Sequence, residues 1–366
     1  MTGERRVRAG PVTIALSGVD PALPTVGVFA GLPAADPDAS VDLRIDFEPD
    51  LRVPGRAARA MGRHPLYAAP GGLVVVDHAG REAYLPLAEL PTRPVRIDPA
   101  LDLHVLQTWV QLPLLRMALH RAGGGLVRCT VVEVEGRRTA LVAPARTGKT
   151  RLVLALLRDG ARLVGDDWIA VDASGRCSPA CRLLVVRDEA RDDTGHRSAR
   201  GLLVRVLRRA AASSMRWRRL SLALAYAADV TWRLGQQIRD VAGVVPDARI
   251  APDPAALDEV VLLSATAAEL ATPDVEDIAE AVAAAAVVEH PEQYVLDGVF
   301  RLAHPGILAV GAMPTQADDR ELARALFRGA RAVLMPFDGT TPTVRRCTEL
   351  LGGRHSAGPD DQGEQL

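Results

Sequence analysis

The chain has 366 residues, of which 48% are hydrophobic, and its 44 basic and 45 acidic side chains leave a formal net charge of −1. This length predicts roughly two or three structural units with enough apolar side chains for a core. A net charge so close to zero favours neither nucleic acid nor a membrane surface as a partner. The four cysteines do not make a disulfide framework, and the eight histidines lack metal-ligand spacing. No apolar signal segment follows Met1, so we expect a soluble, cytoplasmic protein.

Residues 1–103 are predicted to form a smaller, strand-rich N-terminal region. Three segments, 12–16, 41–47 and 72–76, have the composition of strands and are separated by turns rich in proline, glycine and aspartate. The region holds no cluster of side chains with a catalytic pattern, and its role is left open.

A helix is predicted over residues 104–121, where apolar side chains recur at helical spacing up to the three glycines at 123–125. Pro113 lies inside this segment. Because proline lacks a backbone N–H and its ring crowds the preceding turn, we expect it to kink or break the helix.

Residues 104–352 are predicted to form an α/β domain with a mixed sheet flanked by helices. Strands are expected at 126–134 and 139–142, as a hairpin, and at 162–164, 260–263 and 332–336. Helices are expected at 149–158, 275–290 and 342–351, with an arginine-rich helical insertion at about 198–240. The polar tail at 353–366 is expected to be disordered.

Lys149 is the only lysine among the 44 basic residues. A planar guanidinium replaces an ammonium at little cost on a solvated surface, but it is too wide for a cradle of backbone amides around a phosphate. The solitary lysine follows the strand at 139–142 and opens the helix at 149–158, an arrangement typical of polyphosphate binding. The expected nucleotide-binding loop is Ala143, Pro144, Ala145, Arg146, Thr147, Gly148, Lys149 and Thr150. Within it, the Thr150 hydroxyl is expected to ligate Mg²⁺.

A pair of carboxylates, Asp166 and Asp167, follows the strand at 162–164, seventeen residues after the lysine. One carboxylate at such a strand end can hold magnesium, and a second can accept a proton from an attacking hydroxyl. We expect Asp166 to be the metal ligand and Asp167 to be the base. The alternative is that the pair forms an exposed turn.

The segment 126–173 resembles the core of HPr kinase/phosphorylase-type proteins, whose P-loop is like that of phosphoenolpyruvate carboxykinase. The resemblance rests on the run from Arg128 to Ala143, on the loop, and on the string LLRDGARLVGDDWIAVD at 156–172. It continues in outline over 104–352 and is absent before 104. The resemblance implies a P-loop kinase core and ATP-dependent phosphorylation of a hydroxyl, typically a serine of a small protein or peptide.

The chain departs from the pattern of that family at four places. Ala143 stands where the first loop glycine is usual, and Arg128 stands where a histidine is usual. The string beginning at Arg200 (RGLL) is the nearest match to a later Arg-Gly-Leu-Gly motif, and the chain contains no asparagine.

Two functional hypotheses follow, which share ATP and Mg²⁺ as ligands. In the first, the protein is a kinase in which Asp166 and Asp167 divide metal binding and proton abstraction, and Arg128 or Arg200 steadies the γ-phosphate. Its acceptor is a serine or threonine of a protein or peptide, or a small-molecule alcohol. In the second, the protein is a nucleotide-binding regulatory or assembly protein with weak hydrolysis, which the glycine-poor loop and Arg128 favour. A transport or motor ATPase is disfavoured because no Leu-Ser-Gly-Gly string occurs.

Positive charge is concentrated in residues 176–219, which carry twelve arginines against four acidic residues. One interpretation is the solvated face of a helix, and the other is a binding site for an acidic acceptor or a lid over the γ-phosphate. Whether copies of the chain associate into a homo-oligomer is left open by the sequence.

Overall fold

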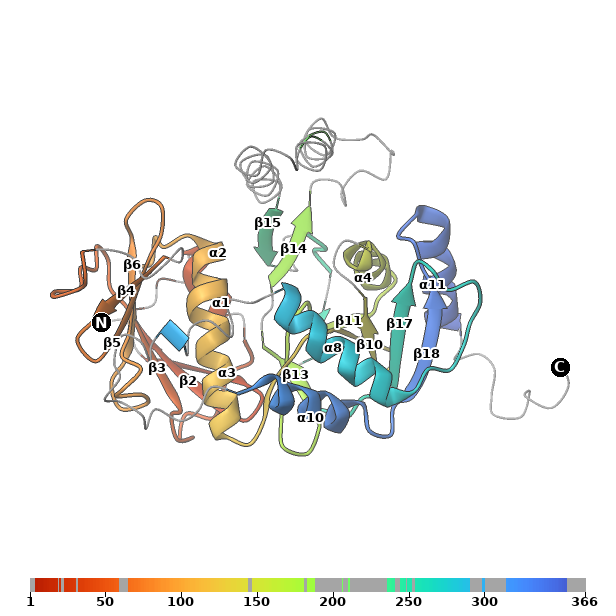
Figure 1. Ribbon diagram of the computed structural model, residues 1–366, viewed down its shortest axis with the longest axis horizontal. Coiled ribbons are helices and arrows are strands. Elements are labelled where there is room, and N and C mark those ends of the chain that lie inside the picture. The colour runs from red at the N-terminus through yellow and green to blue at the C-terminus, as the bar shows by residue number, and fades with distance from the viewer. Residues whose placement is uncertain are drawn as a thin grey trace, which may run out of the picture.

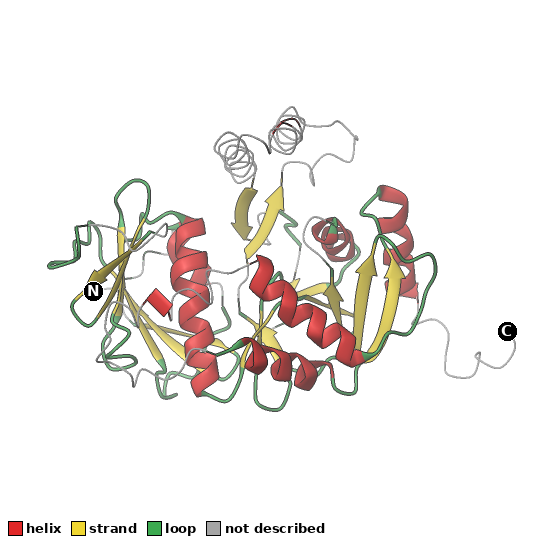
Figure 2. Ribbon diagram, in the orientation of Figure 1, coloured by secondary structure: helices red, strands yellow, loops and turns green. Residues whose placement is uncertain are grey.

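The chain is an α/β protein with mixed sheets and helices, as expected from the sequence, and Figures 1 and 2 show how these are arranged in a computed structural model. The structure describes residues 4–18, 20, 23–30, 32–58, 65–143, 147–180, 183–187, 206, 210, 236–240, 244–247, 249–251, 254–289, 298–299 and 314–353. Within these ranges, no helix combines the length and the apolar character needed to cross a bilayer.

A seven-stranded sheet lies at the N-terminal end, in the order β1-β2-β3-β7-β6-β5-β4. Its strands are β1 (Arg5–Ala9), β2 (Val12–Ser17), β3 (Leu43–Phe47), β4 (Leu66–Ala69), β5 (Gly72–Val76), β6 (Glu82–Leu85) and β7 (Val95–Ile97). The three strands expected from the sequence are confirmed as β2, β3 and β5. The short helix α1 (Pro24–Ala30) and the strands β1, β4, β6 and β7 were not predicted.

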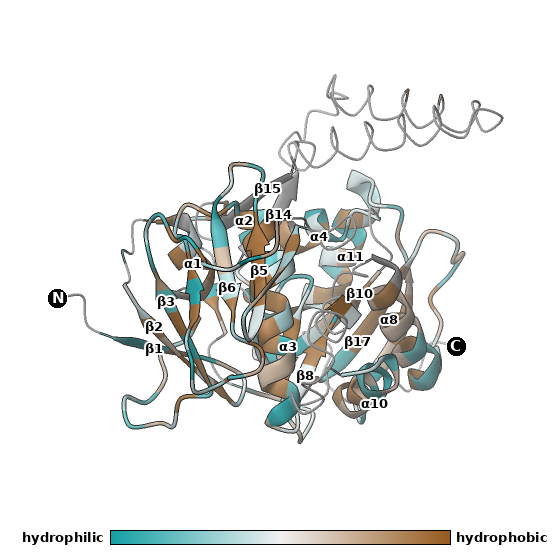
Figure 3. Cartoon of the chain, turned by 60° about the vertical axis from the view of Figure 1, so that its left-hand side comes forward, coloured by the Kyte–Doolittle hydropathy of each residue, from teal (hydrophilic) through white to brown (hydrophobic). Residues whose placement is uncertain are grey.

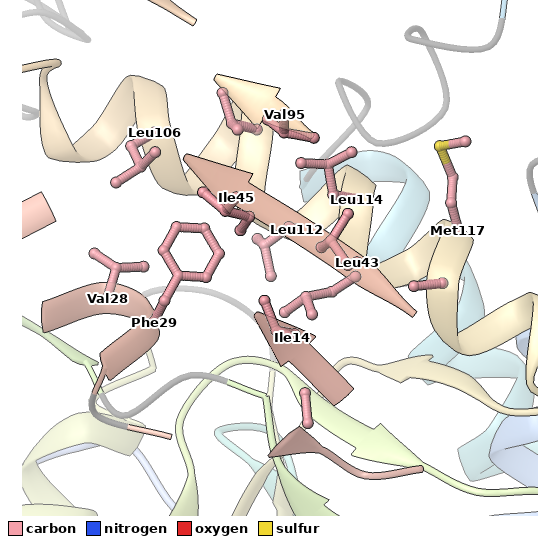
Figure 4. Close-up of a cluster of buried hydrophobic side chains, with 14 of the residues drawn as sticks. Ile14, Val28, Phe29, Leu43, Ile45, Val95, Leu106, Leu112, Leu114 and Met117 are labelled. Atoms are coloured by element: carbon pink, nitrogen blue, oxygen red, sulfur yellow. The ribbon is translucent and has the colours of Figure 1, made fainter. Parts of the chain in front are cut away.

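A long helical segment follows and packs on this sheet as α2 (Leu103–Leu106), the π-helical turn η1 (Gln107–Gln111) and α3 (Leu112–Arg121). The kink or break expected at Pro113 is confirmed as an interruption of the α-helix: the π-helical turn ends just before Leu112, and α3 begins there with the proline in its first turn, where a missing N–H costs no helical hydrogen bond. Leu106 and Leu114 join Ile14, Phe29 and Ile45 of the sheet region in one buried apolar cluster (Figure 4). The division at residue 103 stays a prediction, since the helix beyond it belongs to this core.

A six-stranded sheet forms the second part of the molecule, in the order β16-β11-β9-β10-β17-β18. Its strands are β9 (Thr130–Val134), β10 (Arg137–Val142), β11 (Arg162–Gly165), β16 (Arg249–Ile250), β17 (Glu259–Ser264) and β18 (Arg331–Pro336). β10, β17 and β18 are parallel, while β9 is antiparallel to both β10 and β11. The carboxyl ends of β10, β11, β17 and β18 therefore meet at one edge of the sheet, where α/β proteins bind their ligands.

Helices cover both faces of this sheet (Figure 1). One apolar cluster contains Leu141 with side chains of α4 (Lys149–Arg158) and α11 (Thr341–Gly353). The other contains Ala140 with side chains of α8 (Val275–Glu289) and α10 (Gln316–Phe327). Because neighbouring strand residues point to opposite faces, a central strand covered on both faces is apolar along its covered part. This part is residues 140–142 in β10 and 260–263 in β17, and Figure 3 shows hydrophobic stretches in both strands.

Most elements expected in this part are confirmed. α4 has the expected bounds, and the strands at β11, β17 and β18 and the helices α8 and α11 differ from expectation by two residues or fewer at each end. The hairpin forms as β9 and β10, but the single strand expected at 126–134 is wrong: residues 128 and 129 interrupt it, and its first part is β8 (Gly125–Val127), which pairs in a different sheet. α10 was not predicted.

The helical expectation for 198–240 is wrong at its end. There β15 (Gln236–Asp240) pairs in antiparallel fashion with β14 (Leu183–Arg187), so a pairing distant in sequence overrides the local helical pattern. The rest of that segment lies outside the described residues except Val206 and Ala210, which are helical. The expected disordered tail also lies outside the described residues after Gly353.

Candidate functional site

Two segments of the chain, residues 125–134 and 162–171, run antiparallel to each other, and each contributes one strand to each of two sheets. Both segments are interrupted where they pass from one sheet to the other. β8 (Gly125–Val127) and β9 are separated by Arg128 and Cys129, and β11 and β12 (Ile169–Val171) are separated by Asp166, Asp167 and Trp168. β8 pairs with β12 in a three-stranded sheet that includes β13 (Cys177–Pro179), while β9 pairs with β11 in the six-stranded sheet. The pairing therefore places the 128–129 step directly beside the aspartates.

Asp167 is the more accessible carboxylate, with 29% of its side chain exposed. Its Oδ1 lies 3.2 Å from Nη2 of Arg128 and 4.0 Å from Nζ of Lys149. Its backbone has a left-handed φ of 67°, a conformation that aspartate tolerates better than most residues and that is frequent at functional sites. This conformation turns the chain from β11 toward β12 while the carboxylate stays between the two cations.

Asp166 has the opposite surroundings. The residue is 6% exposed, and its Oδ1 accepts a 2.6 Å hydrogen bond from the hydroxyl of Thr130, a fully buried residue of β9. The same hydroxyl oxygen accepts a weaker hydrogen bond, 3.4 Å, from the backbone N–H of Asp167. Burial raises the pKa of the Asp166 carboxyl, and the nearby Lys149 ammonium acts in the opposite direction. The adjacent carboxylates thus differ in both solvation and charge environment.

The phosphate-binding loop expected at 143–150 connects β10 to α4. Gly148 precedes the helix with a left-handed φ of 95°, and Lys149 is the first helical residue, with 12% of its side chain exposed. Among the described residues no side chain caps this helix end, so the N–H groups of its first turn point toward the position that an anion takes at a helix N-terminus. Ala143 is buried and does not have a left-handed φ, so alanine fits there without strain.

Four of the residues predicted from the sequence come together at this edge of the sheet, namely Arg128, Lys149, Asp166 and Asp167. Pro144, Ala145 and Arg146 of the loop, and Arg200, lie outside the described residues. Most of the arginine-rich segment 176–219 lies outside them as well.

Two further parts of the site were missed. Thr130 lies two positions after Arg128, a spacing that in an extended segment indicates a shared face. The loop between β18 and α11, residues 337–340, contacts Thr147 and Gly148, and its Asp-Gly pair after a predicted strand was an available turn signal.

The oxygen donors at this edge of the sheet are few for a metal ion held by protein side chains alone. The part of the chain that is described contains no group of three or more His, Cys, Asp or Glu side chains able to hold a metal ion. Mg²⁺ in nucleotide sites typically takes only one or two protein carboxylates and completes its shell with phosphate oxygens and water. Thr150, in the first turn of α4, and Asp166 therefore fit magnesium that arrives with a nucleotide.

Comparison with models of known protein families and with curated protein sequences found no match to this chain.

Proposed function

We propose that this protein is an ATP-dependent kinase that transfers the γ-phosphoryl group to a hydroxyl acceptor. The observation that carries the proposal is the 4.0 Å approach of Lys149, at the start of α4, to Asp167, at the end of β11. The first is a cation at a helix N-terminus suited to phosphate, and the second is an accessible carboxylate suited to a hydroxyl proton. Phosphoryl transfer needs both beside the same phosphoryl group, the ammonium against its oxygens and the carboxylate against the attacking hydroxyl.

The loop at 143–150 is the expected seat of the triphosphate. Its amides and the first turn of α4 bind the phosphate oxygens, and Lys149 neutralises the charge between the β- and γ-phosphates. Thr150 and Asp166 would hold Mg²⁺, which would supply positive charge to offset the charge that develops on the phosphate oxygens.

Asp167 accepts the proton from the acceptor hydroxyl as its oxygen attacks the γ-phosphorus, and ADP leaves. Arg128 lies 3.2 Å from the Asp167 carboxylate, which keeps that group oriented and places a guanidinium beside the phosphoryl group in transfer. The acceptor class is a serine or threonine of a protein or peptide, or a small-molecule alcohol.

A second candidate is a nucleotide-binding regulatory or assembly protein with weak hydrolysis. One observation favours it, since Asp167 lies between two cations, Arg128 and Lys149. A carboxylate that contacts two cations is less available to an acceptor hydroxyl, and this second candidate requires only slow attack by water on the bound nucleotide.

Transfer of label from γ-labelled ATP tests the proposal. Purified protein is incubated with labelled ATP and either fractionated lysate or a panel of alcohols, beside its Asp167→Asn and Lys149→Met variants. Label on an acceptor that is lost in both variants supports a kinase. Binding of Mg-ATP with slow phosphate release and no labelled acceptor supports the second candidate, and no binding of Mg-ATP contradicts both.

A further inference from the structure

The loop between β18 and α11, residues 337–340, is in direct contact with the end of the expected phosphate-binding loop at Thr147 and Gly148. Gly339, with a left-handed φ of 74°, and Gly148 face each other so closely that a Cβ atom on Gly148 would lie 2.8 Å from the Cα of Gly339. A Cβ atom on Gly339 would overlap the carbonyl oxygen of Thr147, which is backbone and has no side-chain freedom to move away. Two glycines are needed here because two backbones touch.

Arg151, in the first turn of α4, ties the two loops together. Its backbone N–H donates a 2.9 Å hydrogen bond to the carbonyl of Gly148. Its guanidinium donates a 3.0 Å hydrogen bond to the carbonyl of Gly339 and a 3.3 Å hydrogen bond to the Thr341 hydroxyl. One residue thus holds both sides of the glycine contact.

The supporting loop is itself fixed by Asp338. Its Oδ1 accepts hydrogen bonds from the backbone N–H and the hydroxyl of Thr340, at 2.9 and 2.7 Å, and from the hydroxyl of Thr343 at 2.7 Å. These hydrogen bonds, first that from the Thr340 hydroxyl, lower the pKa of Asp338 to about 2, so the acceptor is a carboxylate at neutral pH. The turn that presents Gly339 is therefore a preformed element.

We infer that Gly339 and Arg151 are positioning residues for the bound phosphates. The nucleotide-binding loop contains a single glycine, Gly148, so its amide directions depend on a support outside the loop. A shift of Thr147 and Gly148 moves the start of α4 and with it Lys149, whose ammonium must reach the bridging phosphate oxygens. The inference rests on the proposed function only in assuming that residues 143–150 bind nucleotide phosphates.

Gly339→Ala is the test, with Gly329→Ala as its matched control. Both glycines have a left-handed φ, 74° and 82°, so both variants carry the same kind of backbone strain. A Cβ on Gly329 meets no described atom within 4 Å, and that glycine precedes β18 at the opposite edge of the sheet. Dissociation constants for Mg-ATP and for tripolyphosphate are measured by calorimetry, and melting temperatures without ligand are measured beside them.

We expect Gly339→Ala to weaken both ligands by about tenfold or more, because displacements near 1 Å at a binding site have effects of that size. Gly329→Ala should change neither constant beyond about twofold, and it should lose only the stability that the left-handed backbone costs, because its Cβ meets no described atom within 4 Å. Equal weakening of ATP and tripolyphosphate supports positioning of the phosphates. A Gly339→Ala variant with a lowered melting temperature but unchanged dissociation constants overturns the inference.

A second pair of variants decides the matter if Gly339→Ala does not fold. Arg151→Met removes the hydrogen bonds to Gly339 and Thr341, and Arg345→Met removes an exposed helical ion pair of α11 instead. We expect weaker binding of tripolyphosphate in Arg151→Met alone, with partial rescue in Arg151→Lys. If Arg151→Met binds tripolyphosphate as tightly as the wild type does, the inference is overturned. The proposed function is not affected by that result as long as the wild-type protein binds Mg-ATP. Wild-type protein that binds no Mg-ATP overturns the proposed function itself.

Discussion

Replacing Asp166 with asparagine should make the protein more stable at neutral pH and abolish phosphoryl transfer. Burial raises the pKa of this carboxyl in the folded state. The folded protein therefore holds the proton more tightly than the unfolded chain does, and stability falls as pH rises from the unfolded pKa, 3.8, up to the folded pKa. Asparagine carries no charge, so it does not have this cost.

The size of the gain follows from the shift. Each unit by which the pKa is raised corresponds to about 1.4 kcal/mol at pH values above the folded pKa. With an entropy of unfolding of about 2.1 cal/mol/K per residue, that is roughly 2 °C in melting temperature for a chain of this length. The Oδ1 atom of asparagine still accepts the hydrogen bond from Thr130, so no buried hydroxyl loses its acceptor.

Thermal unfolding at about pH 4 and about pH 7, followed by circular dichroism, measures the effect. Asp167→Asn is the matched control, because its carboxylate is more exposed and faces Arg128 and Lys149. Asparagine also tolerates the left-handed backbone at position 167. We expect Asp166→Asn to melt above the wild type at the higher pH only, and Asp167→Asn to melt no higher at either. A loss of stability in Asp166→Asn at pH 7, or a gain of equal size at both pH values, refutes the reasoning.

Three further outcomes are expected. Lys149→Arg should lose affinity for Mg-ATP although the charge is kept, because the guanidinium is too wide for the loop; an unchanged dissociation constant contradicts this. Arg128→Gln should lower the rate of transfer by about tenfold or more and leave Mg-ATP affinity within about threefold, and an unchanged rate would show that this guanidinium does not assist transfer. Burial raises the pKa of the Cys129 thiol, so a thiol reagent should modify it in the native protein no faster than the chain unfolds, which mass spectrometry can follow.

The elements that the sequence predicted well are those whose signals are local. α4 was placed with its bounds because apolar residues recur every three or four positions between Gly148 and Gly160, two glycines with left-handed φ. The hairpin of β9 and β10 was placed by two short, mostly apolar segments on either side of Glu135 and Gly136, which form its turn.

Other elements depend on contacts between residues far apart in the chain. β6 is four residues long and buried throughout, so it lacks the alternation that indicates a strand, and its partners are set by the whole seven-stranded sheet. α10 is different, because Thr315 and Asp318 form a capping box that the sequence displays before an amphipathic segment. The sequence therefore carries a local signal for the start of α10.

In the candidate site too, some parts have local sequence signals and others depend on contacts between residues far apart in the chain. The chain order alone placed Lys149 and the aspartates on one strand-loop-helix-strand unit. The contact of Gly148 with Gly339 joins residues 191 positions apart, and only the parallel order of β10, β17 and β18 brings them together. Local sequence patterns cannot predict a contact between residues so far apart in the chain. In the structure both glycines have a left-handed φ, which glycine adopts without strain.

The adjacency of the two aspartates has a physical consequence that one aspartate could not provide. A carboxylate buried enough to be held rigidly by Thr130 is costly to ionise, whereas a carboxylate that meets an acceptor hydroxyl must be accessible. The pair lies in the interruption between β11 and β12, where the chain leaves the regular strand, so the two neighbouring carboxylates meet different surroundings. The left-handed φ of Asp167 then keeps the accessible carboxylate beside Lys149. Rotation of the side chains alone cannot exchange the roles of metal ligand and base between the two aspartates. We therefore expect the two asparagine variants to fail in different steps: Asp166→Asn in magnesium-dependent binding of ATP, and Asp167→Asn in phosphoryl transfer from bound ATP.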